Sequence, residues 1–367
     1  MMTIGIRELA EEAKRSGAID LAQGIIQKDP PDSLYKALTE LTPRSALYNN
    51  KRGVMELRQV LTEWLIERKW KVRLDNLMIT SGAMGGIATA LVNAVAPGGR
   101  VALPEPFFFG DKLLLDELKY KTSYLKPPLH EEVDWQLIQE AMKENDALIL
   151  TSPANPTGHV APFETLKKLS ENAVTRNCFL IVDETYREFI WDNPPVNDEQ
   201  YNGINFEKTV AIRSFSKTLS IPGWRVGFAI TSPNNIERMA TVHDSFYIGG
   251  STIAQYALAR SFSRTRDELM SYVSNLRETF LFNLDVLTRS FKAYGMEPLP
   301  VSATYYMLLK HDESSDMEAV KKLMKRGIVT TPLNILYSDS EKDTGYIRIH
   351  FAVSKETAEK VADILGG

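Results

Sequence analysis

A chain of 367 residues is longer than an average domain, so one large domain with a smaller one is expected. Hydrophobic residues make up 44% of the chain and charged residues 25%, as in an ordinary globular protein. With 43 Lys and Arg against 47 Asp and Glu the net charge is −4, and neither sign forms a long run. Composition and charge therefore argue against a nucleic-acid-binding or membrane-binding surface.

The single cysteine, Cys178, can form no disulfide within the chain, which favours a reducing, cytoplasmic location. It precedes a strand pattern and is expected to be a small buried side chain. The first 17 residues predict an amphipathic helix rather than a signal peptide. We expect no metal site, because the spacing of the five histidines is not typical of ligands: His130, His159, His243, His311 and His350.

Short apolar runs alternate with helical patterns through the middle of the chain. Six runs rich in Val, Ile and Leu predict buried strands, within residues 76–82, 100–106, 147–153, 178–184, 209–215 and 225–230. Helical patterns lie between them, at 84–95, 110–118, 134–144 and 163–174. This alternation predicts an α/β fold, a mostly parallel sheet covered by helices on both faces.

The pattern changes near residue 264, where a long helical stretch begins. It is followed by a strand pattern at 304–310, a helix near 315–325, a strand at 345–353 and a last helix at 354–365. We therefore expect a large domain over residues 38–263 and a smaller α+β domain over 264–367. Residues 1–37 are expected to pack on the small domain.

The segment SFSKTLSIPGWRVGF, residues 214–228, carries the strongest chemical signal. It places Lys217 between Ser214 and Ser216, with Arg225 nearby. Arginine offers phosphate oxygens a planar fork, serine hydroxyls donate to the rest, and lysine forms imines with aldehydes. A phosphate with a reactive aldehyde describes pyridoxal 5′-phosphate (PLP). On its own, the window also fits a solvated loop before a strand.

Three further motifs stand in order: ITSGAMGGI at 79–87, SPANPTG at 152–158 and IVDETYREF at 181–189. Together the four motifs resemble those of the class I/II aminotransferases of fold type I, the aspartate aminotransferase-like superfamily. The resemblance runs from about residue 18 to the C-terminus. It implies the fold type I architecture, PLP as cofactor, a homodimer with shared active sites, and amino-group transfer between an L-amino acid and a 2-oxo acid.

The resemblance also implies catalytic roles. Lys217 would hold the cofactor as a Schiff base, carry it through aldimine and ketimine intermediates, and move the substrate proton. Asp183 would pair with the pyridine nitrogen, although an aspartate there also suits a helix N-cap. Asn155 and Tyr186 would hydrogen-bond the cofactor's phenolic oxygen, although NPTG alone is simply a turn signal.

Other positions follow from the same resemblance. Phe108 would stack on the ring, where the family more usually has Tyr or Trp. Tyr48 would reach a phosphate across the subunit interface. Arg348 would clamp the substrate carboxylate with its planar fork, and Asn155 and the backbone of Gly24 would also contact the substrate. The phosphate-binding set would be Ser81, Gly82, Ala83, Ser214, Ser216 and Arg225.

The substrate and reaction outcome stay open. The C-terminal strand pattern resembles the kynurenine/methionine branch, whereas Arg213 and DETYREF resemble the histidinol-phosphate branch. Phe108, Tyr48, Tyr305 and Tyr306 favour an aromatic or large neutral substrate by analogy. The same site could support C–S β-elimination, ring closure or oxygen-dependent amino acid oxidation. A non-catalytic PLP-sensing regulator is a remote alternative, since such regulators carry an additional DNA-binding domain.

Overall fold

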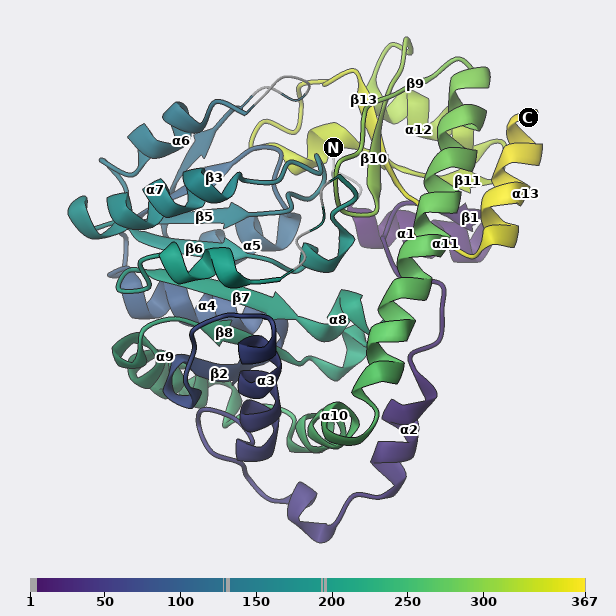
Figure 1. Cartoon of the computed structure of the whole chain (residues 1–367). Helices are drawn as coiled ribbons and strands as arrows, with labels where there is room; N and C mark the ends of the chain where they lie inside the picture. The colour runs from purple at the N-terminus through teal and green to yellow at the C-terminus, as the bar shows by residue number, and fades with distance from the viewer. Residues whose placement is uncertain (1–4, 128, 130–132, 193, 195–196, 367) are drawn as a thin grey trace.

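The computed structural model describes residues 5–127, 129, 133–192, 194 and 197–366. Its centre is a seven-stranded sheet with the order β2-β8-β7-β6-β5-β3-β4 (Figure 1). The bounds of these strands are Leu77–Thr80 (β2), Arg100–Pro104 (β3), Lys121–Leu125 (β4), Ala147–Thr151 (β5), Phe179–Asp183 (β6), Thr209–Ser214 (β7) and Gly227–Ile230 (β8). All six predicted strands are present, and the α/β prediction is confirmed.

Two features of this sheet lie outside the prediction. Strand β4 reads KTSYL, with an exposed first residue and three half-buried ones, so it lacks the apolar run that marks a buried strand. It pairs in parallel with β3 at the edge of the sheet. Strand β8 runs antiparallel to both β7 and β2, so the sheet is mixed.

Helices cover both faces of the sheet, and each face has its own core. On one side, apolar residues of α4 (Gly82–Ala94), α5 (Phe109–Glu117) and α9 (Pro233–Tyr247) pack on the strands. On the other, α6 (Trp135–Ala141) and α7 (Phe163–Thr175) do so. Strand β6 is buried along its whole length, because β5 and β7 pair with it on either side.

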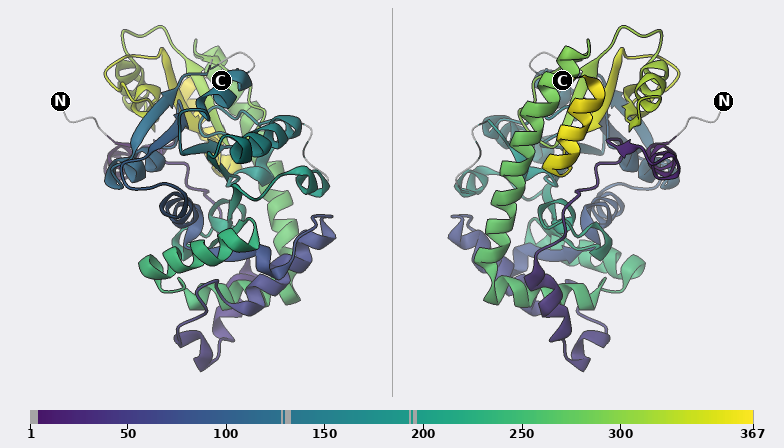
Figure 2. Two further views of the ribbon diagram at one scale, coloured as in Figure 1. Left: turned by 90° about the vertical axis from the view of Figure 1, so that its left-hand side faces the viewer. Right: turned by 90° about the vertical axis from the view of Figure 1, so that its right-hand side faces the viewer.

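A second, four-stranded antiparallel sheet has the order β12-β13-β10-β9. Its strands are Glu297–Pro298 (β9), Tyr306–Lys310 (β10), Thr331–Pro332 (β12) and Tyr346–His350 (β13), with α12 (Asp316–Met324) packed beside them. The long helix α11 (Arg266–Ala293) runs from the lower part of the molecule up to this sheet, and α13 (Lys355–Leu365) packs along it (Figure 2). The domain boundaries expected at residues 38 and 264 stay predictions.

The N-terminal segment contacts the part of the chain that carries the second sheet. Helix α1 (Ile6–Ser16) leads into β1 (Ile19–Asp20), which pairs in parallel with β11 (Ile328–Val329). The first four residues of the expected amphipathic helix, and His130, lie outside the described residues. The remaining helices are α2 (Asp32–Thr39), α3 (Met55–Glu67), α8 (Phe215–Thr218) and α10 (Thr252–Arg264).

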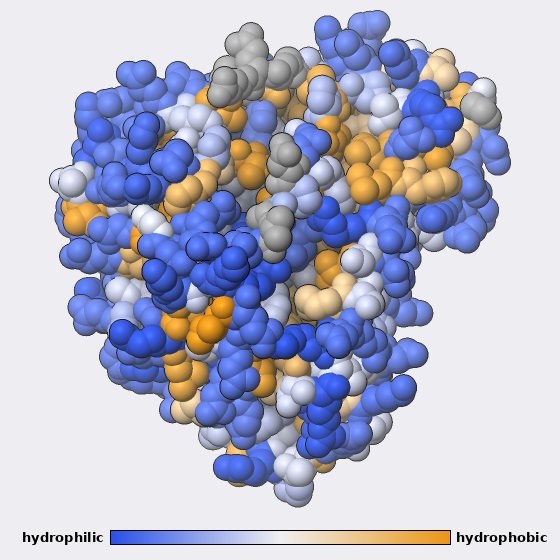
Figure 3. Space-filling view, viewed as in Figure 1, coloured by the Kyte–Doolittle hydropathy of each residue, from blue (hydrophilic) through white to orange (hydrophobic). Residues whose placement is uncertain are grey.

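The exterior is mixed in character. On the face shown in Figure 3, most of the surface is hydrophilic and hydrophobic residues appear in separate small groups. Across the described part of the chain, no helix is long and apolar enough to cross a membrane. Cys178 is fully buried beside β6, as predicted.

Candidate active site

The carboxyl ends of three neighbouring strands carry most of the predicted residues. Asp183 ends β6, where it pairs with Thr151 of β5 and Ile212 of β7. Beyond β7, Lys217 lies in the one-turn helix α8, whose N-cap is Ser214. In open α/β sheets this edge is where ligands bind. The sheet thus places Asp183 and Lys217 at the same edge, as predicted.

Asp183 is a buried carboxylate with an unusual environment. Thr185 donates both its backbone N–H and its hydroxyl to Oδ1, at 2.9 and 2.6 Å. Burial raises the pKa of Asp183 to about 6, against the opposing effect of the two Thr185 hydrogen bonds, and the neighbouring Glu184 charge adds to the rise. A buried carboxylate of this kind favours a cationic partner. A protonated ring nitrogen would provide one.

Lys217 contacts the N-terminal segment. Its Nζ donates to the carbonyl of Gly24 at 3.3 Å, and the Tyr305 hydroxyl donates to the same oxygen at 3.1 Å. Gly24 has φ +68°, and a Cβ there would lie 2.3 Å from the Tyr306 Oη. Glycine is therefore required at this position both for its backbone conformation and for the close approach of Tyr306.

Arg348 extends from β13 toward the same segment. One guanidinium nitrogen donates to the Ala22 carbonyl at 2.7 Å and the other to Asn155 Oδ1 at 3.2 Å. The guanidinium lies 4.4 Å from the centre of the Tyr306 ring. Its Nε is buried and has no hydrogen-bond partner among the described residues, and burial lowers the pKa of Arg348. A carboxylate bound here would supply the charge and the acceptor that the buried guanidinium lacks.

Tyr186 belongs to a buried aromatic group beside this arginine. Its hydroxyl lies 3.3 Å from that of Tyr306, and its ring meets the Tyr305 and Tyr306 rings edge to face. Burial raises the pKa of Tyr186 well above its ordinary value, so the hydroxyl is a proton donor at neutral pH. The Asn155–Pro156 peptide bond is cis.

The N-terminus of α4 forms the other end of the site. Gly82 has φ +70°, and a Cβ there would lie 2.6 Å from an Arg225 guanidinium nitrogen. Arg225 itself has a left-handed backbone, φ +56°, and donates to the Ser81 carbonyl at 3.4 Å. The Ser214 and Ser216 hydroxyls lie 3.0 Å apart. Amides at a helix N-terminus, hydroxyls and a guanidinium together suit a phosphate.

His243 supports this end and was missed by the sequence analysis. The backbone N–H of Ser81 donates to His243 Nε2 at 3.0 Å. Burial lowers the pKa of His243 to about 4, so the ring is neutral near pH 7 and its Nε2 can accept. A search for ligand spacing could not find it, because it acts alone and on a backbone group 162 residues away.

Three predicted residues are placed less decisively. Phe108 precedes α5 and its ring lies 4.8 Å from that of Phe109. Ala83 is half-buried in the first turn of α4. Tyr48 is 85% exposed, and within the described residues it makes no hydrogen bond to the other candidates. A single chain therefore does not bring Tyr48 into the site.

Comparison with known proteins identifies the family of this chain. The model of the family "Aminotransferase class I and II" matches residues 16–365. The chain belongs to this family. Its members are PLP-dependent enzymes, so the prediction of an aminotransferase fold and enzyme class is confirmed.

Individual relatives are distant but cover nearly the whole chain. A (5-formylfuran-3-yl)methyl phosphate transaminase of Methanocaldococcus jannaschii is 27% identical, over 92% of this chain and 88% of its own. An aromatic aminotransferase of Arabidopsis thaliana is 25% identical, over 95% and 89%. A solved Escherichia coli structure with a methionine aminotransferase function superposes with a TM-score of 0.88 and 23% identity, over 100% and 96%.

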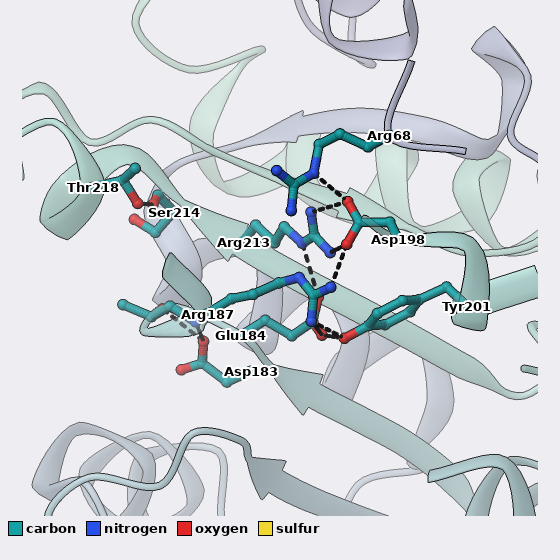
Figure 4. Close-up of polar contacts among 10 residues, drawn as sticks. Arg68, Asp183, Glu184, Arg187, Asp198, Tyr201, Arg213, Ser214 and Thr218 are labelled. Atoms are coloured by element: carbon teal, nitrogen blue, oxygen red, sulfur yellow. Dashed lines mark hydrogen bonds and ion pairs between the residues drawn. The ribbon is translucent and has the colours of Figure 1, made fainter. Parts of the chain in front are cut away.

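Behind the strand ends, this aminotransferase has a buried ionic cluster (Figure 4). Its members are Arg68, Glu184, Arg187, Asp198, Tyr201 and Arg213. Arg213, read in the sequence as a marker of one family branch, donates through Nε to Glu184 Oε2 at 2.9 Å. No sequence motif joins these residues, because the bond from Arg68 to Asp198 spans 130 positions.

Proposed function

We propose that this aminotransferase uses PLP to transfer an amino group between an L-amino acid with an aromatic or large neutral side chain and a 2-oxo acid. The observation that carries the proposal is the meeting of Lys217 and Arg348 at one short segment. They come from different sheets, yet Lys217 donates to the Gly24 carbonyl and Arg348 to the Ala22 carbonyl. An amine and a carboxylate-binding guanidinium that contact carbonyls two residues apart suit an α-amino acid.

The residues present fit the cofactor. When bound, PLP supplies an aldehyde for the substrate amine and a ring that accepts electrons from its Cα. Asp183 would hold a proton at the ring nitrogen, and Asn155 and Tyr186 would donate to the phenolic oxygen. Phe108 would cover one face of the ring. The phosphate would be held by Ser81, Gly82, Ala83, Ser214, Ser216 and Arg225. The close approach of the Arg225 guanidinium to the backbone of Gly82 supports this set.

On the substrate, Arg348 would bind and orient the α-carboxylate, with Asn155 and the backbone of Gly24 alongside. The Lys217 amine would remove the proton from Cα and deliver it to the C4′ carbon of the cofactor, since an amine displaced from an imine is free to act as a base. Its bond to the Gly24 carbonyl keeps it beside the substrate. Asp183, by contrast, would keep the ring nitrogen protonated throughout.

A neighbouring cavity supports the neutral substrate. It has a volume of about 260 Å³ and is lined by Tyr306 together with Pro156, Leu299, Val301 and Leu308, among others. None of its described lining residues is Asp, Glu, Lys or Arg. An apolar side chain would lose water there without leaving a charge unpaired, whereas a second carboxylate would find no cation.

We also propose that the enzyme works as a cytoplasmic homodimer with shared sites. Tyr48 and Leu47 are 85% and 64% exposed, and Thr252 ties their loop to the exposed Ile253 by donating to the Leu47 carbonyl at 3.0 Å. Large exposed apolar side chains gathered on a loop and on the adjoining first turn of α10 are typical of an interface. Covering this patch by a second copy would carry each Tyr48 to the partner's site.

The test is a panel of amino acids added singly to holoenzyme, followed by absorbance and by identification of the products. Aromatic and large neutral amino acids should convert the bound cofactor to its amine form and yield the matching 2-oxo acid, with an Arg348→Met variant requiring far higher concentrations. Ammonia release or oxygen consumption without a new amino acid would replace transfer with a lyase or oxidase outcome. Faster conversion by aspartate or glutamate would contradict the neutral substrate.

A further inference from the structure

The strand ends that carry the site have two sides with different chemistry. Successive residues of a strand point to opposite faces, so Asp183 and Glu184 diverge, and so do Arg213 and Ser214. Figure 4 shows Asp183 and Ser214 on one side and Glu184 and Arg213 on the other. Asp183 pairs with Ile212 in the parallel register, which sets Glu184 beside Arg213. The cofactor side and the ionic cluster are therefore back to back across the same two strands.

The cluster is tightly connected. Arg213 bonds to Glu184 at 2.9 Å and to Asp198 at 3.3 Å. Arg187 pairs with Asp198 and donates to the Tyr201 hydroxyl, which itself donates to Glu184. The side chains of Glu184, Asp198, Arg187 and Arg213 are 0–6% exposed, so the charges are well shielded from water.

The charges of the cluster do not cancel. Arg68, Arg187 and Arg213 carry three positive charges, and Glu184 and Asp198 carry two negative ones. Although burial alone would raise the pKa of Asp198, the charges of Arg213 and Arg187 hold it well below its ordinary value. The positive charge left over is that of Arg68, whose side chain is 21% exposed to water, whereas the two buried arginines balance the two buried carboxylates.

The Glu184 charge acts on the neighbouring Asp183, whose pKa it raises, and Arg213 pairs with Glu184 on the far side of the strand. We propose that the ionic cluster is an electrostatic support for the active site, with Arg213 as a positioning residue whose charge keeps the Asp183 carboxyl ionised from behind the sheet. The cluster also fixes the two strand ends against each other, because the Glu184–Arg213 bond joins β6 to β7. Only the interpretation of Asp183 as the partner of the ring nitrogen rests on the proposed function.

Other groups around Asp183 carry charges of both signs. Besides Glu184 and Arg213, the charged neighbours are Lys217 on α8 and Asp111 on α5. Burial and the Asp183 charge raise the pKa of Asp111 well above its ordinary value. Strand β5 and helix α4, which also pack on β6, carry no charged residue, and α7 turns apolar side chains to the strand. The effect of Arg213 on the ionisation of Asp183 must therefore be measured, because the number of nearby charges alone does not give it.

The test compares two variants that break the same ion pair but change the charge in opposite directions. Cofactor-free enzyme enriched with ¹³C in its aspartate carboxyl groups is titrated by NMR, and the Asp183 signal is assigned by its absence in Asp183→Asn. Arg213→Gln should raise the pKa of Asp183 by about one unit, a tenfold change in proton affinity, and Glu184→Gln should lower it by a similar amount. Arg213→Lys should restore most of the wild-type value.

A purely structural role of the ionic cluster predicts a different pattern of pKa changes at Asp183. Loss of packing would move the pKa in the same direction in both variants, or not at all, and either result in folded protein would overturn the proposal. Should Arg213→Gln fail to fold, Arg68→Gln replaces it, since that side chain is 21% exposed and lies at the rim. It should raise the pKa of Asp183 by a smaller amount, and no rise would equally overturn the proposal. The matched control is Lys69→Gln, because Lys69 is adjacent but 62% exposed and should have no effect.

Because this titration is read without cofactor or substrate, it is independent of the amino acid panel. The proposed electrostatic support could be refuted while the amino acid panel still shows transfer to a 2-oxo acid. Conversely, it could be upheld while the panel shows another reaction. Circular dichroism and thermal unfolding of each variant establish that the compared proteins share one fold.

Discussion

Two glycines of the N-terminal segment share a left-handed backbone but have different surroundings, which allows a sharp test of the site's packing. Gly17 and Gly24 have left-handed backbones, with φ +67° and +68°. A Cβ at Gly17 would meet nothing within 4 Å, whereas one at Gly24 would lie 2.3 Å from Tyr306 Oη. The alanine variants therefore share the backbone strain, and only Gly24→Ala must also displace a buried tyrosine.

The magnitudes follow from these contacts. A left-handed alanine costs about 1–2 kcal/mol, which both variants lose. An ordinary contact is about 3.5 Å, so the overlap at Gly24 is about 1 Å, and overpacking of that kind costs a further ~1–3 kcal/mol. With an unfolding entropy of about 2 cal/mol/K per residue, Gly17→Ala should lower the Tm by about 2 °C and Gly24→Ala by about 3–6 °C.

The assay pairs thermal unfolding with steady-state kinetics. Since the Gly24 carbonyl accepts from both Lys217 and Tyr305, moving it should also reduce kcat/KM, whereas Gly17→Ala should keep the wild-type value. Equal Tm and equal kcat/KM in the two variants would refute the close approach of Tyr306 to the backbone.

Three further outcomes are expected. Folded Asp183 binds its proton more tightly than the unfolded chain, since its pKa is raised to about 6, so the apoprotein should lose about 3 kcal/mol of stability as the pH rises from about 3 to about 7. Asp183→Asn should remove that contribution, and an unchanged slope would refute it. Burial raises the pKa of Cys178 to about 12, so iodoacetamide should label it only in denaturant, and rapid labelling of native protein would contradict its burial. Borohydride should fix the cofactor to the peptide containing Lys217, and attachment persisting in a folded Lys217→Ala variant would show that another lysine is responsible.

Much of the site could be predicted because its residues lie at strand ends. Parallel strands bring their carboxyl ends to one edge, so Asp183 after one apolar run and Lys217 after another had to be neighbours once both strands were recognised. Arg348 was identified through the resemblance to the family, and the structure places it between Ile347 and Ile349 in the middle of β13.

Residues that act through long-range contacts could not be predicted. His243 accepts from the backbone of Ser81, and Arg68 pairs with Asp198 across 130 positions. Neither contact leaves a periodicity or a motif in the sequence. Strand β4 was missed for a related reason, since its half-buried side chains lack the apolar run of a central strand.

The ionic cluster shows where sequence reasoning could have gone one step further. The pairs Asp183–Glu184 and Arg213–Ser214 are visible in the chain, and alternation along a strand already separates the members of each pair. What the sequence lacks is the register, which pairs Asp183 with Ile212 and so brings Glu184 beside Arg213. Glu184 and Arg213, which face away from Asp183 and Ser214, thereby join the two strand ends that carry those residues. A charge placed in this way can act on the chemistry without touching the substrate, which is why the opposite charge changes at Glu184 and Arg213 provide the decisive comparison.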